Sequence, residues 1–482
     1  MKLFEILDGI ECHYDDDLKD KEVKDIKIDS RLVKEGDIFV ALKGEKFDGN
    51  KYISQALANG AVAVISDENV GDKIVCVPSA RKAYALACKN YFGRACDKLK
   101  IVGVTGTNGK TTTTFITKEV LLSSGLKAGV ICTLGADVGG EKVDTGFTTP
   151  DPYILHKIFK EMLDEGTQYV VMEASAHALY LDKLEGIKFE IGVLTNITED
   201  HLDYFKNMNR YSKAKFKLFE EGRVKLGIVC GDDIMCRKLL KNPQVPLISY
   251  GLSNGNDITA TDIVQDSSGV KFKFEGLGKE FNVKCPLVGE YNIQNILASS
   301  GICLAFGVPI ELVRLGLSKV NPVEGRFNVI KMGGVTIVID FAHTPDGLEK
   351  VLTTARKITD GRLTVVFGCG GNRDKMKRPI MGKVAQDFAD NVILTSDNPR
   401  FEEPEQIISE IADGMELNST KMPNRKDAIR YALSNAKDGE TIVIAGKGGE
   451  KYQEIKGEKI PYNDFDEVYS FYRNKIKEVE NE

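Results

Sequence analysis

The chain has 482 residues, more than the roughly 100 to 200 of one typical domain, so we expect about two to four separately packed cores. Its composition, 42% hydrophobic and 28% charged, is typical of a globular protein and excludes a disordered or membrane-embedded chain. The net charge of -6 argues against charge-driven binding of nucleic acid or anionic lipid, so any bound phosphate must be met by local groups.

The sequence shows no targeting or membrane signal. The start, MKLFEILDGI, lacks a basic region followed by a long apolar run, and no later stretch approaches the roughly 18 apolar residues that cross a bilayer. We therefore expect a cytoplasmic protein without an integral membrane segment. The ten Cys show no paired metal-type spacing, which favours reduced structural thiols over disulfides or a zinc site.

Residues 1–98 predict a small α/β domain. Residues 37–42 and 61–65 are apolar runs of strand type, and the Ala-rich stretch 53–59 has a helical pattern. At Leu99 the pattern changes, and a longer α/β segment begins.

Residues 99–327 predict a parallel sheet covered by helices. A buried strand at 101–104 leads into a Gly-rich turn and a helix, and further apolar runs follow at 169–172 and 191–194.

Residues 328–482 predict a second, smaller doubly wound domain of Rossmann type. Four apolar runs, each followed by Gly, Asp, Asn or His, have the pattern of buried parallel strands: 335–339, 363–367, 391–395 and 441–445. Ligands of such sheets bind beyond the carboxyl ends of the strands, which is where these polar residues fall.

A phosphate-binding loop is predicted at 106–111, where Gly-Thr-Asn-Gly-Lys-Thr lies between a strand and a helix. Backbone N–H groups at a helix N-terminus can surround a phosphate, Lys110 can contact the β- and γ-phosphates, and the Thr111 hydroxyl can bind magnesium. The strict Walker pattern has Gly where Val104 stands, so the loop departs from the commonest form. Such a loop indicates nucleotide binding but not the reaction.

Two acidic motifs follow the next strands of this segment. Glu173 comes directly after 169–172, where its carboxylate can serve a hard cation, and His201 stands beside Asp200 and Asp203 after 191–194. Alone, His201 fits a solvated or core histidine somewhat better than a ligand, and neither motif is specific.

Together and in this order, the motifs resemble those of the Mur ligase family, ATP-dependent enzymes that join an amino acid to a peptidoglycan precursor. Further family motifs are Tyr211-Ser-Lys-Ala-Lys215, Gly289-Glu-Tyr-Asn292 with Asn295, Gly325-Arg326 and Asp340-Phe-Ala-His-Thr-Pro-Asp346. The resemblance covers nearly the whole chain. It implies a three-domain α/β architecture, with a small UDP-substrate-binding domain at 1–98, a central P-loop-type ATPase domain at 99–327 and a Rossmann-like amino-acid-binding domain at 328–482.

The resemblance also implies the nucleotide and metal sites, with ATP and Mg²⁺ as cofactors. The implied nucleotide contacts are Gly106, Thr107, Asn108, Gly109, Lys110, Thr111, Thr112, Asn292, Asn295, Arg326 and Asp340. The implied metal ligands are Thr111, Glu173 and His201, and the implied catalytic residues are Lys110, Glu173, His201 and Lys215.

Lys215 is carbamylated in several relatives, so the resemblance implies N6-carboxylysine at this position. The alternative is a solvated lysine on a helix, because Lys213 and Lys217 make the spacing uninformative. Burial distinguishes the two, since a desolvated neutral amine reacts with carbon dioxide and an exposed ammonium does not.

The first segment resembles the uridine-nucleotide domain of family members at Asp29-Ser30-Arg31, 36–41 and 48–50, with Ser30 as the implied UDP contact. A folylpolyglutamate synthetase is not expected to carry this domain. The implied contacts to the muramoyl peptide are Thr148, Thr149, Ser175 and Lys183. Relatives often have Gln and Arg where Leu181 and Lys183 stand, and a lysine supplies charge but no fork.

The last segment matches family members that select meso-2,6-diaminopimelate, through Asp397-Asn398-Pro399-Arg400. Diaminopimelate has one carboxylate more than lysine, and a guanidinium binds a carboxylate through two parallel charge-assisted bonds. The resemblance assigns Arg373 to the other carboxylate, and the Gly446 carbonyl and Glu450 to the distal ammonium. The usual His of that last motif is Gly449 here.

The implied reaction adds meso-diaminopimelate to UDP-N-acetylmuramoyl-L-alanyl-D-glutamate through an acyl phosphate. We expect a monomer that acts on small-molecule substrates and binds no nucleic acid. Three alternatives stay open: the same ligation with L-lysine, a ligase for folate or another acid, and a non-catalytic nucleotide-binding partner protein.

Overall fold

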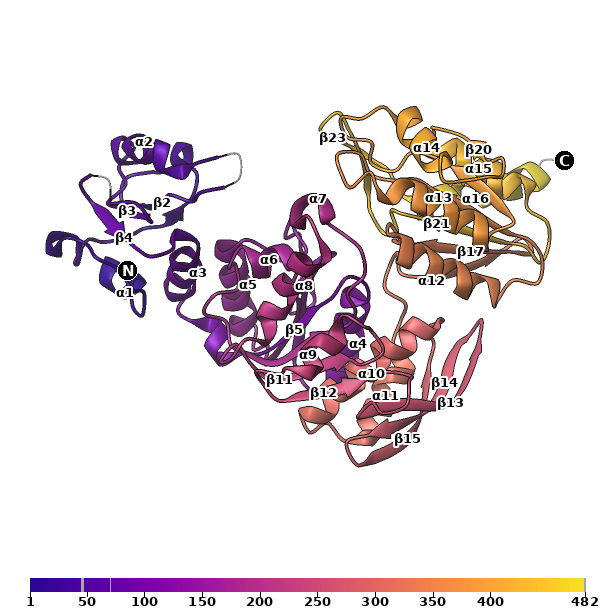
Figure 1. Ribbon diagram of the computed structural model, residues 1–482, viewed down its shortest axis with the longest axis horizontal. Coiled ribbons are helices and arrows are strands. Elements are labelled where there is room, and N and C mark those ends of the chain that lie inside the picture. Colours follow the sequence, from indigo (N-terminus) through magenta and orange to yellow (C-terminus); the bar gives the residue numbers. More distant parts are fainter. Residues whose placement is uncertain (45–46, 70, 481–482) are drawn as a thin grey trace.

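The computed structural model describes residues 1–44, 47–69 and 71–480. Three α/β units follow one another along the chain, each built on its own sheet, and the middle unit lies between the other two (Figure 1). Within the described part, no helix has the length and apolar character that spanning a membrane requires. All ten cysteines are free thiols.

The first unit has a four-stranded parallel sheet in the order β1-β2-β3-β4. Its strands are β1 (Ile26–Lys27), β2 (Ile38–Val40), β3 (Ala63–Ser66) and β4 (Ile74–Cys76), and its helices are α1 (Leu3–Ile6), α2 (Ile53–Ala58) and α3 (Ala80–Tyr91). The strands expected at 37–42 and 61–65 are β2 and β3, and the expected helix is α2.

The middle unit has an eleven-stranded sheet in the order β15-β14-β13-β12-β11-β10-β5-β9-β6-β7-β8. The strands are β5 (Lys100–Thr105), β6 (Ala128–Cys132), β7 (Gly135–Val138), β8 (Glu141–Val143), β9 (Tyr169–Glu173), β10 (Phe189–Leu194), β11 (Val224–Cys230), β12 (Leu247–Tyr250), β13 (Ile258–Asp266), β14 (Gly269–Gly276) and β15 (Lys279–Cys285). The helices are α4 (Lys110–Ser123), α5 (Pro152–Asp164), α6 (Ala176–Tyr180), α7 (Leu202–Phe205), α8 (Met208–Phe216), α9 (Cys236–Lys241), α10 (Glu290–Ala305) and α11 (Ile310–Lys319).

The parallel part of this sheet is the part that the sequence predicts. Strands β5, β6, β9, β10, β11 and β12 pair in parallel, and β5 is buried on both faces after its first residue. The expected parallel sheet is incomplete. Strands β7 and β8 extend one edge through antiparallel pairs, and at the other edge β13 pairs in parallel with β12 and is followed by the antiparallel strands β14 and β15.

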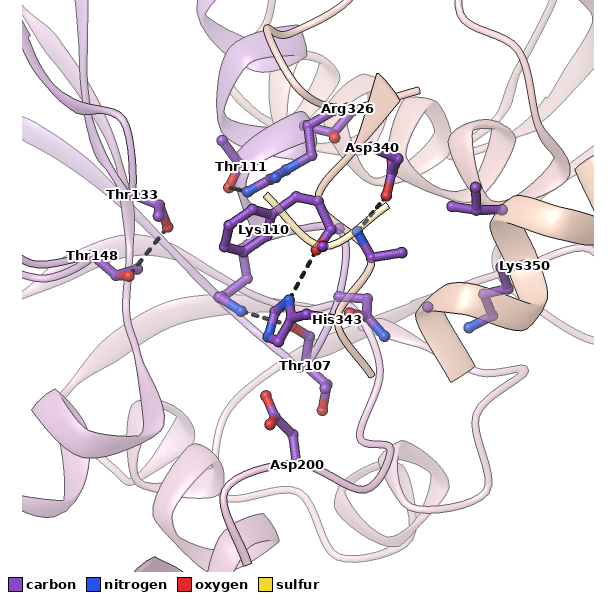
Figure 2. Close-up of a pocket in the computed structure, with 18 of the residues that line it drawn as sticks. Thr107, Lys110, Thr111, Thr133, Thr148, Asp200, Arg326, Asp340, His343 and Lys350 are labelled. Atoms are coloured by element: carbon purple, nitrogen blue, oxygen red, sulfur yellow. Dashed lines mark hydrogen bonds between the residues drawn. The ribbon is translucent and has the colours of Figure 1, made fainter. Parts of the chain in front are cut away.

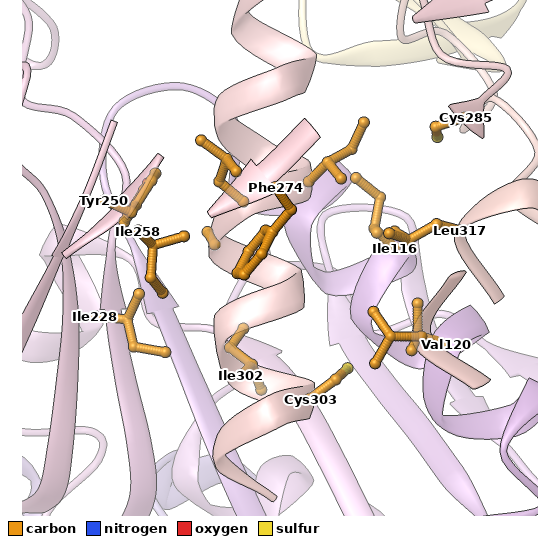
Figure 3. Packing of buried hydrophobic residues seen from close by; sticks show 14 of the residues in the cluster. Ile116, Val120, Ile228, Tyr250, Ile258, Phe274, Cys285, Ile302, Cys303 and Leu317 are labelled. Atoms are coloured by element: carbon orange, nitrogen blue, oxygen red, sulfur yellow. The ribbon is translucent and has the colours of Figure 1, made fainter. Parts of the chain in front are cut away.

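Two apolar cores sandwich the middle sheet. One joins α4, α10 and α11 to β13–β15, with Val120, Ile302 and Phe274 among its buried side chains (Figure 3). The other packs α5, α6 and α8 against the opposite face. This double cover explains why the predicted strands are continuous apolar runs rather than alternating ones.

The last unit has a six-stranded sheet in the order β16-β17-β21-β18-β19-β20, parallel except for the β16–β17 pair. Its strands are β16 (Asn328–Met332), β17 (Val335–Asp340), β18 (Leu363–Phe367), β19 (Asn391–Leu394), β20 (Thr420–Lys421) and β21 (Thr441–Ala445), followed by the hairpin β22 (Tyr452–Ile455) and β23 (Glu458–Pro461). Helices α12 (Pro345–Arg356), α13 (Lys377–Phe388) and α14 (Pro404–Ala412) cover one face, and α15 (Arg425–Asn435) and α16 (Asp464–Glu480) cover the other. The doubly wound prediction is confirmed.

Candidate active site

A cavity of about 410 Å³ lies between the middle and last units, at the carboxyl ends of strands from both sheets (Figure 2). Most residues that the sequence singled out line it: Thr107, Asn108, Gly109, Lys110, Thr111, Thr112, Thr148, Glu173, His201, Asn292, Asn295, Arg326, Asp340, Arg373, Asp397, Asn398, Arg400, Gly446 and Glu450. The remaining ones, Ser30, Gly106, Thr149, Ser175, Lys183, Lys215 and Pro399, lie outside this lining.

The phosphate loop joins the end of β5 to the start of α4. The Lys110 ammonium folds back over the loop and donates to the Gly106 and Thr107 carbonyls at 3.0 and 2.7 Å. Burial lowers the pKa of Lys110, against the pull of Glu173 and Asp200.

Two glycines let this loop pass close to its neighbours. A Cβ on Gly106 would lie 1.8 Å from the Thr195 hydroxyl, and a Cβ on Gly109 would lie 2.5 Å from Asn295 Oδ1. Both glycines also have positive φ, +144° and +84°. The Thr107 and Asn108 amides donate to the carbonyl and Oδ1 of Asn196, both at 2.9 Å, whereas the first amides of α4 have no acceptor within the helix. A polyphosphate fits these amides and the charge of Lys110.

Glu173 and Thr111 meet beside the loop. The Thr111 hydroxyl donates to Glu173 Oε1 at 2.7 Å, and the Thr133 amide donates to the same oxygen at 3.1 Å. Glu173 is buried, so its carboxylate needs such partners. A hydroxyl and a carboxylate are oxygen ligands that suit Mg²⁺.

No group of three or more His, Cys, Asp and Glu side chains converges on a possible metal position in the described ranges. This donor set fits Mg²⁺ bound largely through water and substrate phosphates, since that ion commonly takes only one or two protein carboxylates.

His201 lines the same cavity but lies beside Asp200, whose Oδ2 is 3.3 Å from its Nε2. Burial lowers the pKa of His201 to about 4, although Asp200 opposes the shift. The lowered pKa favours the neutral imidazole, which has a nitrogen lone pair. The His177 ring lies 4.9 Å away and packs against it edge to face.

Lys215 lies under the phosphate loop on α8. It is 1% exposed, its ammonium donates to the Gly106 carbonyl at 2.7 Å, and it lies 4.4 Å from the centre of the Tyr211 ring. Burial lowers the pKa of this amine well below its usual range, and Lys110 lowers it further. The solvated alternative for Lys215 is wrong.

Asn292 and Asn295 on α10 face the loop from the other side. The Asn292 amide donates to the Val288 carbonyl at 2.7 Å, and the Asn295 amide donates to Asn292 Oδ1 at 3.0 Å. The Thr113 hydroxyl donates to Asn295 Oδ1 at 3.3 Å, which ties α10 to α4.

Arg326 and Asp340 lie on the nucleotide side of the cavity, where the middle unit meets the last one. The Arg326 guanidinium lies 4.2 Å above the Phe341 ring and donates to the Thr111 hydroxyl at 3.4 Å (Figure 2). Asp340 accepts the Phe327 and Ala342 amides at 2.7 and 2.6 Å. Burial raises the pKa of Asp340 to about 6, although Arg326 opposes the shift.

In the last unit, a buried lysine connects two polar side chains that line the cavity. Lys447 is fully buried and donates to Asn398 Oδ1 at 2.9 Å and to Glu450 Oε2 at 2.8 Å. The Asn398 amide also donates to Glu450 Oε2 at 2.9 Å. Asp397 is buried next to Gly446, where a Cβ would lie 2.6 Å from its Oδ2.

Arg400 reaches the cavity from the loop after β19. Its Nε donates to Glu454 Oε2 at 2.9 Å and its Nη1 donates to the Gly371 carbonyl at 2.8 Å. Arg373 is exposed and lines the same wall. Together with Arg326 on the nucleotide side, the cavity thus presents three guanidinium groups, and Arg373 and Arg400 share it with the Glu450 carboxylate and the Gly446 backbone.

The residues expected to hold a muramoyl peptide divide into two groups. Thr148 lines the cavity and lies 3.1 Å from the Thr133 hydroxyl (Figure 2), whereas Thr149 donates to the Glu173 carbonyl at 2.8 Å. Ser175 caps α6 by accepting the Ala178 amide at 3.2 Å.

Lys183 and Ser30 already have partners within the chain. The Lys183 ammonium lies 3.1 Å from Asp151 Oδ2 and 5.3 Å from the centre of the Phe147 ring. Ser30 belongs to the first unit, where its hydroxyl donates to Gln55 Oε1 at 2.8 Å.

Sequence reasoning missed several polar residues of the site. Asp346 accepts the Asn108 amide at 2.8 Å and the Lys350 ammonium at 2.9 Å, which connects the phosphate loop to α12. Lys377 donates to the His343 carbonyl at 2.8 Å. The signal for Asp346 and His343 was present, because both lie inside the motif that begins at Asp340; Lys350 and Lys377 have no such signal.

Three family models match the chain in order. The Mur ligase family catalytic domain matches residues 22–87, the Mur ligase middle domain matches 104–303, and the Mur ligase glutamate ligase domain matches 325–448.

Individual relatives match over nearly the full length. The chain is 40% identical to the UDP-N-acetylmuramoyl-L-alanyl-D-glutamate--2,6-diaminopimelate ligase of Clostridium botulinum, across 96% of this chain and 98% of the relative. It is 41% identical to the protein of the same name from Aquifex aeolicus, across 92% of each. A solved structure of a ligase with that name matches at a TM-score of 0.72 and 32% identity, over 98% of this chain and 99% of the other.

Proposed function

The chain belongs to the Mur ligase family, and on that premise we propose that it joins meso-2,6-diaminopimelate to UDP-N-acetylmuramoyl-L-alanyl-D-glutamate in peptidoglycan synthesis. It is an ATP-dependent ligase that forms an amide bond, and its cofactors are ATP and Mg²⁺. Its substrates are small molecules.

One observation carries the choice of substrate. Arg400 and Glu450 line the same cavity as the phosphate loop, and Asn398, which Lys447 holds, donates to Glu450. The distal end of diaminopimelate carries a carboxylate and an ammonium on one carbon. The Arg400 guanidinium can bind that carboxylate, and the Glu450 carboxylate can bind that ammonium.

ATP phosphorylates the γ-carboxylate of the D-glutamyl residue, and the amine of diaminopimelate attacks the resulting acyl phosphate through a tetrahedral intermediate. A new C–N bond forms, phosphate leaves, and the products are the muramoyl tripeptide, ADP and phosphate. The protein contributes alignment and charge: Lys110 and the loop N–H groups meet the transferred phosphoryl group. Mg²⁺ held at Thr111 and Glu173 would neutralise phosphate charge.

We infer that Lys215 carries a carbamate. Its amine is buried, and desolvation lowers its pKa well below the usual range, which favours the neutral form that adds to carbon dioxide with loss of one proton. A ¹³C carbamate resonance after incubation with labelled bicarbonate should appear in the wild type and in Lys213→Arg, an exposed position on α8, but not in Lys215→Arg.

We also propose domain boundaries at 1–98, 99–327 and 328–482, which place each of the three sheets in one domain. The first domain would bind the UDP part at Ser30, the second ATP, and the third the amino acid. We also propose that the protein is a cytoplasmic monomer. Sedimentation at micromolar concentration tests the monomer.

The experiment that tests the proposed function is phosphate release with ATP, Mg²⁺ and UDP-N-acetylmuramoyl-L-alanyl-D-glutamate, comparing meso-diaminopimelate with L-lysine. We expect release with diaminopimelate alone and a weaker response in Arg400→Lys, because lysine cannot form the two-bond fork. Equal or better release with L-lysine contradicts the substrate but keeps the ligase. Release with neither amino acid contradicts the whole assignment.

A further inference from the structure

The hairpin β22–β23 packs along the loop that carries Arg400. The Glu454 amide donates to Asn398 Oδ1 at 2.9 Å, and the Gln453 side-chain amide donates to the Asp397 carbonyl at 2.6 Å. In the backbone, the Arg400 amide donates to the Glu454 carbonyl at 3.0 Å. Strand β22 therefore serves as a template for residues 397–400.

The backbone of Arg400 is held in an uncommon conformation. Its φ is +53°, in the left-handed region that residues with a Cβ rarely adopt. Besides the bond to Glu454, the Arg400 carbonyl accepts the Lys456 amide at 2.7 Å, so β22 grips this residue on both sides. These two hydrogen bonds fix the position of the Arg400 backbone, but its long, flexible side chain needs a restraint of its own.

Glu454 supplies that restraint at the guanidinium. Glu454 Oε2 accepts Arg400 Nε at 2.9 Å, and the Gly371 carbonyl accepts Nη1 at 2.8 Å. An arginine has five N–H donors, so these two bonds leave three for a ligand in the cavity. The Glu454 charge also compensates the guanidinium while no ligand carboxylate is bound.

We propose that Glu454 is a positioning residue that orients Arg400 toward the second carboxylate of the amino-acid substrate. This inference rests on the proposed function, because it requires a substrate with that carboxylate. The side chains of Arg400 and Glu454 are 19% and 25% exposed, and partly exposed ion pairs contribute little to folding stability. Loss of Glu454 should therefore affect binding of the amino acid far more than folding.

The test compares Glu454→Ala and Glu454→Gln with a control on the same hairpin, Glu458→Ala, whose side chain is exposed on β23. In Glu454→Ala we expect KM for diaminopimelate to rise about tenfold, the scale of one charge-assisted hydrogen bond. KM for ATP, KM for the UDP substrate and the melting temperature should stay unchanged. Glu454→Gln keeps an acceptor for Nε and should recover most of the affinity, and the control should match the wild type.

A double-mutant cycle separates orientation of Arg400 from a general effect of the hairpin. In an Arg400→Ala background, Glu454→Ala should add no further increase in KM for diaminopimelate. An unchanged KM in Glu454→Ala overturns the proposal, and so does a parallel rise of all three KM values with a lower melting temperature. If Glu454→Ala fails this test while the wild type uses diaminopimelate, the proposed function stands. If the wild type uses only L-lysine, both are overturned.

Discussion

Asp340 shows how a single buried carboxyl group can make the stability of the protein depend on pH. Its pKa is about 6 in the folded chain, against 3.8 for the ordinary group, because burial disfavours the charged form. Between these values the folded state holds more protons than the unfolded state. The stability that this group contributes is therefore present at low pH and is lost as pH rises through about 4 to 6.

We expect Asp340→Asn to remove this dependence. Between pH 4 and 7, the free energy of unfolding of the wild type should fall relative to that of the variant by an amount on the order of 3 kcal/mol. Urea unfolding at several pH values measures the difference directly. A difference that is constant over this range would contradict a raised pKa for Asp340.

At the scale of elements, the connection from β5 to α4 depends on the space beside Gly106. In Gly106→Ala, the new Cβ would lie 1.8 Å from the Thr195 hydroxyl, so the loop must move away from β10. We expect affinity for ATP to fall at least a hundredfold, because the loop N–H groups lose their alignment. Isothermal titration with a non-hydrolysable ATP analogue measures this loss.

Gly125→Ala is the matched control for this substitution. Gly125 also has positive φ, +78°, but no atom lies within 4 Å of the position of its Cβ. It should lower stability by about 1 kcal/mol through backbone strain and leave ATP affinity unchanged. Equal losses of affinity in both variants would show that backbone strain, not the contact with Thr195, controls the loop.

The elements that the sequence predicted correctly are those with local patterns. The strand before Gly106 and the helix from Lys110 are neighbours in sequence, and the confirmed fold class follows from several such strand-to-helix units. The antiparallel strands β13–β15 were missed because β13 is largely exposed beyond its first residues and has no continuous apolar run. Patterns of burial along one strand do not reveal how far a sheet continues.

The site shows the same limit. Thr111 and Glu173 could be paired from the sequence only through the resemblance, since 62 positions separate them. Glu454 is 54 positions from Arg400 and belongs to no motif that the sequence displayed, so its contact with the guanidinium could not be predicted. The binding roles of the cavity residues stay predictions until the variants are measured.

At the scale of the whole molecule, Tyr153 joins the first unit to the middle one. Its ring lies 5.0 Å from that of Phe92 and 6.4 Å from that of Tyr91, at the end of α3, and Lys27 lies 5.9 Å above it. Aromatic contacts of this kind are directional, so Tyr153 sets how the first unit sits on α5.

We expect Tyr153→Ala to raise KM for the UDP substrate severalfold and to leave KM for ATP unchanged. The substrate must bridge the first unit and the cavity, whereas ATP contacts only the middle and last units in the proposed arrangement. Steady-state kinetics with each substrate varied in turn would show this. Ile154→Ala, at an exposed neighbouring position on α5, is the control. If Tyr153→Ala changed KM for the UDP substrate and KM for ATP equally, Tyr153 would not be what sets the position of the first unit.

The last unit meets the phosphate loop directly, because Asp346 accepts the Asn108 side-chain amide. Arg326, which lies just before β16, donates to the Thr111 hydroxyl. A nucleotide that strengthens these contacts also fixes the position of the last unit, and with it Arg400, relative to the phosphate loop. Binding of ATP and binding of the amino acid are then heterotropically linked, and the linkage must be reciprocal. The factor by which ATP tightens the amino acid equals the factor by which the amino acid tightens ATP, so either ligand can report on the occupancy of the other.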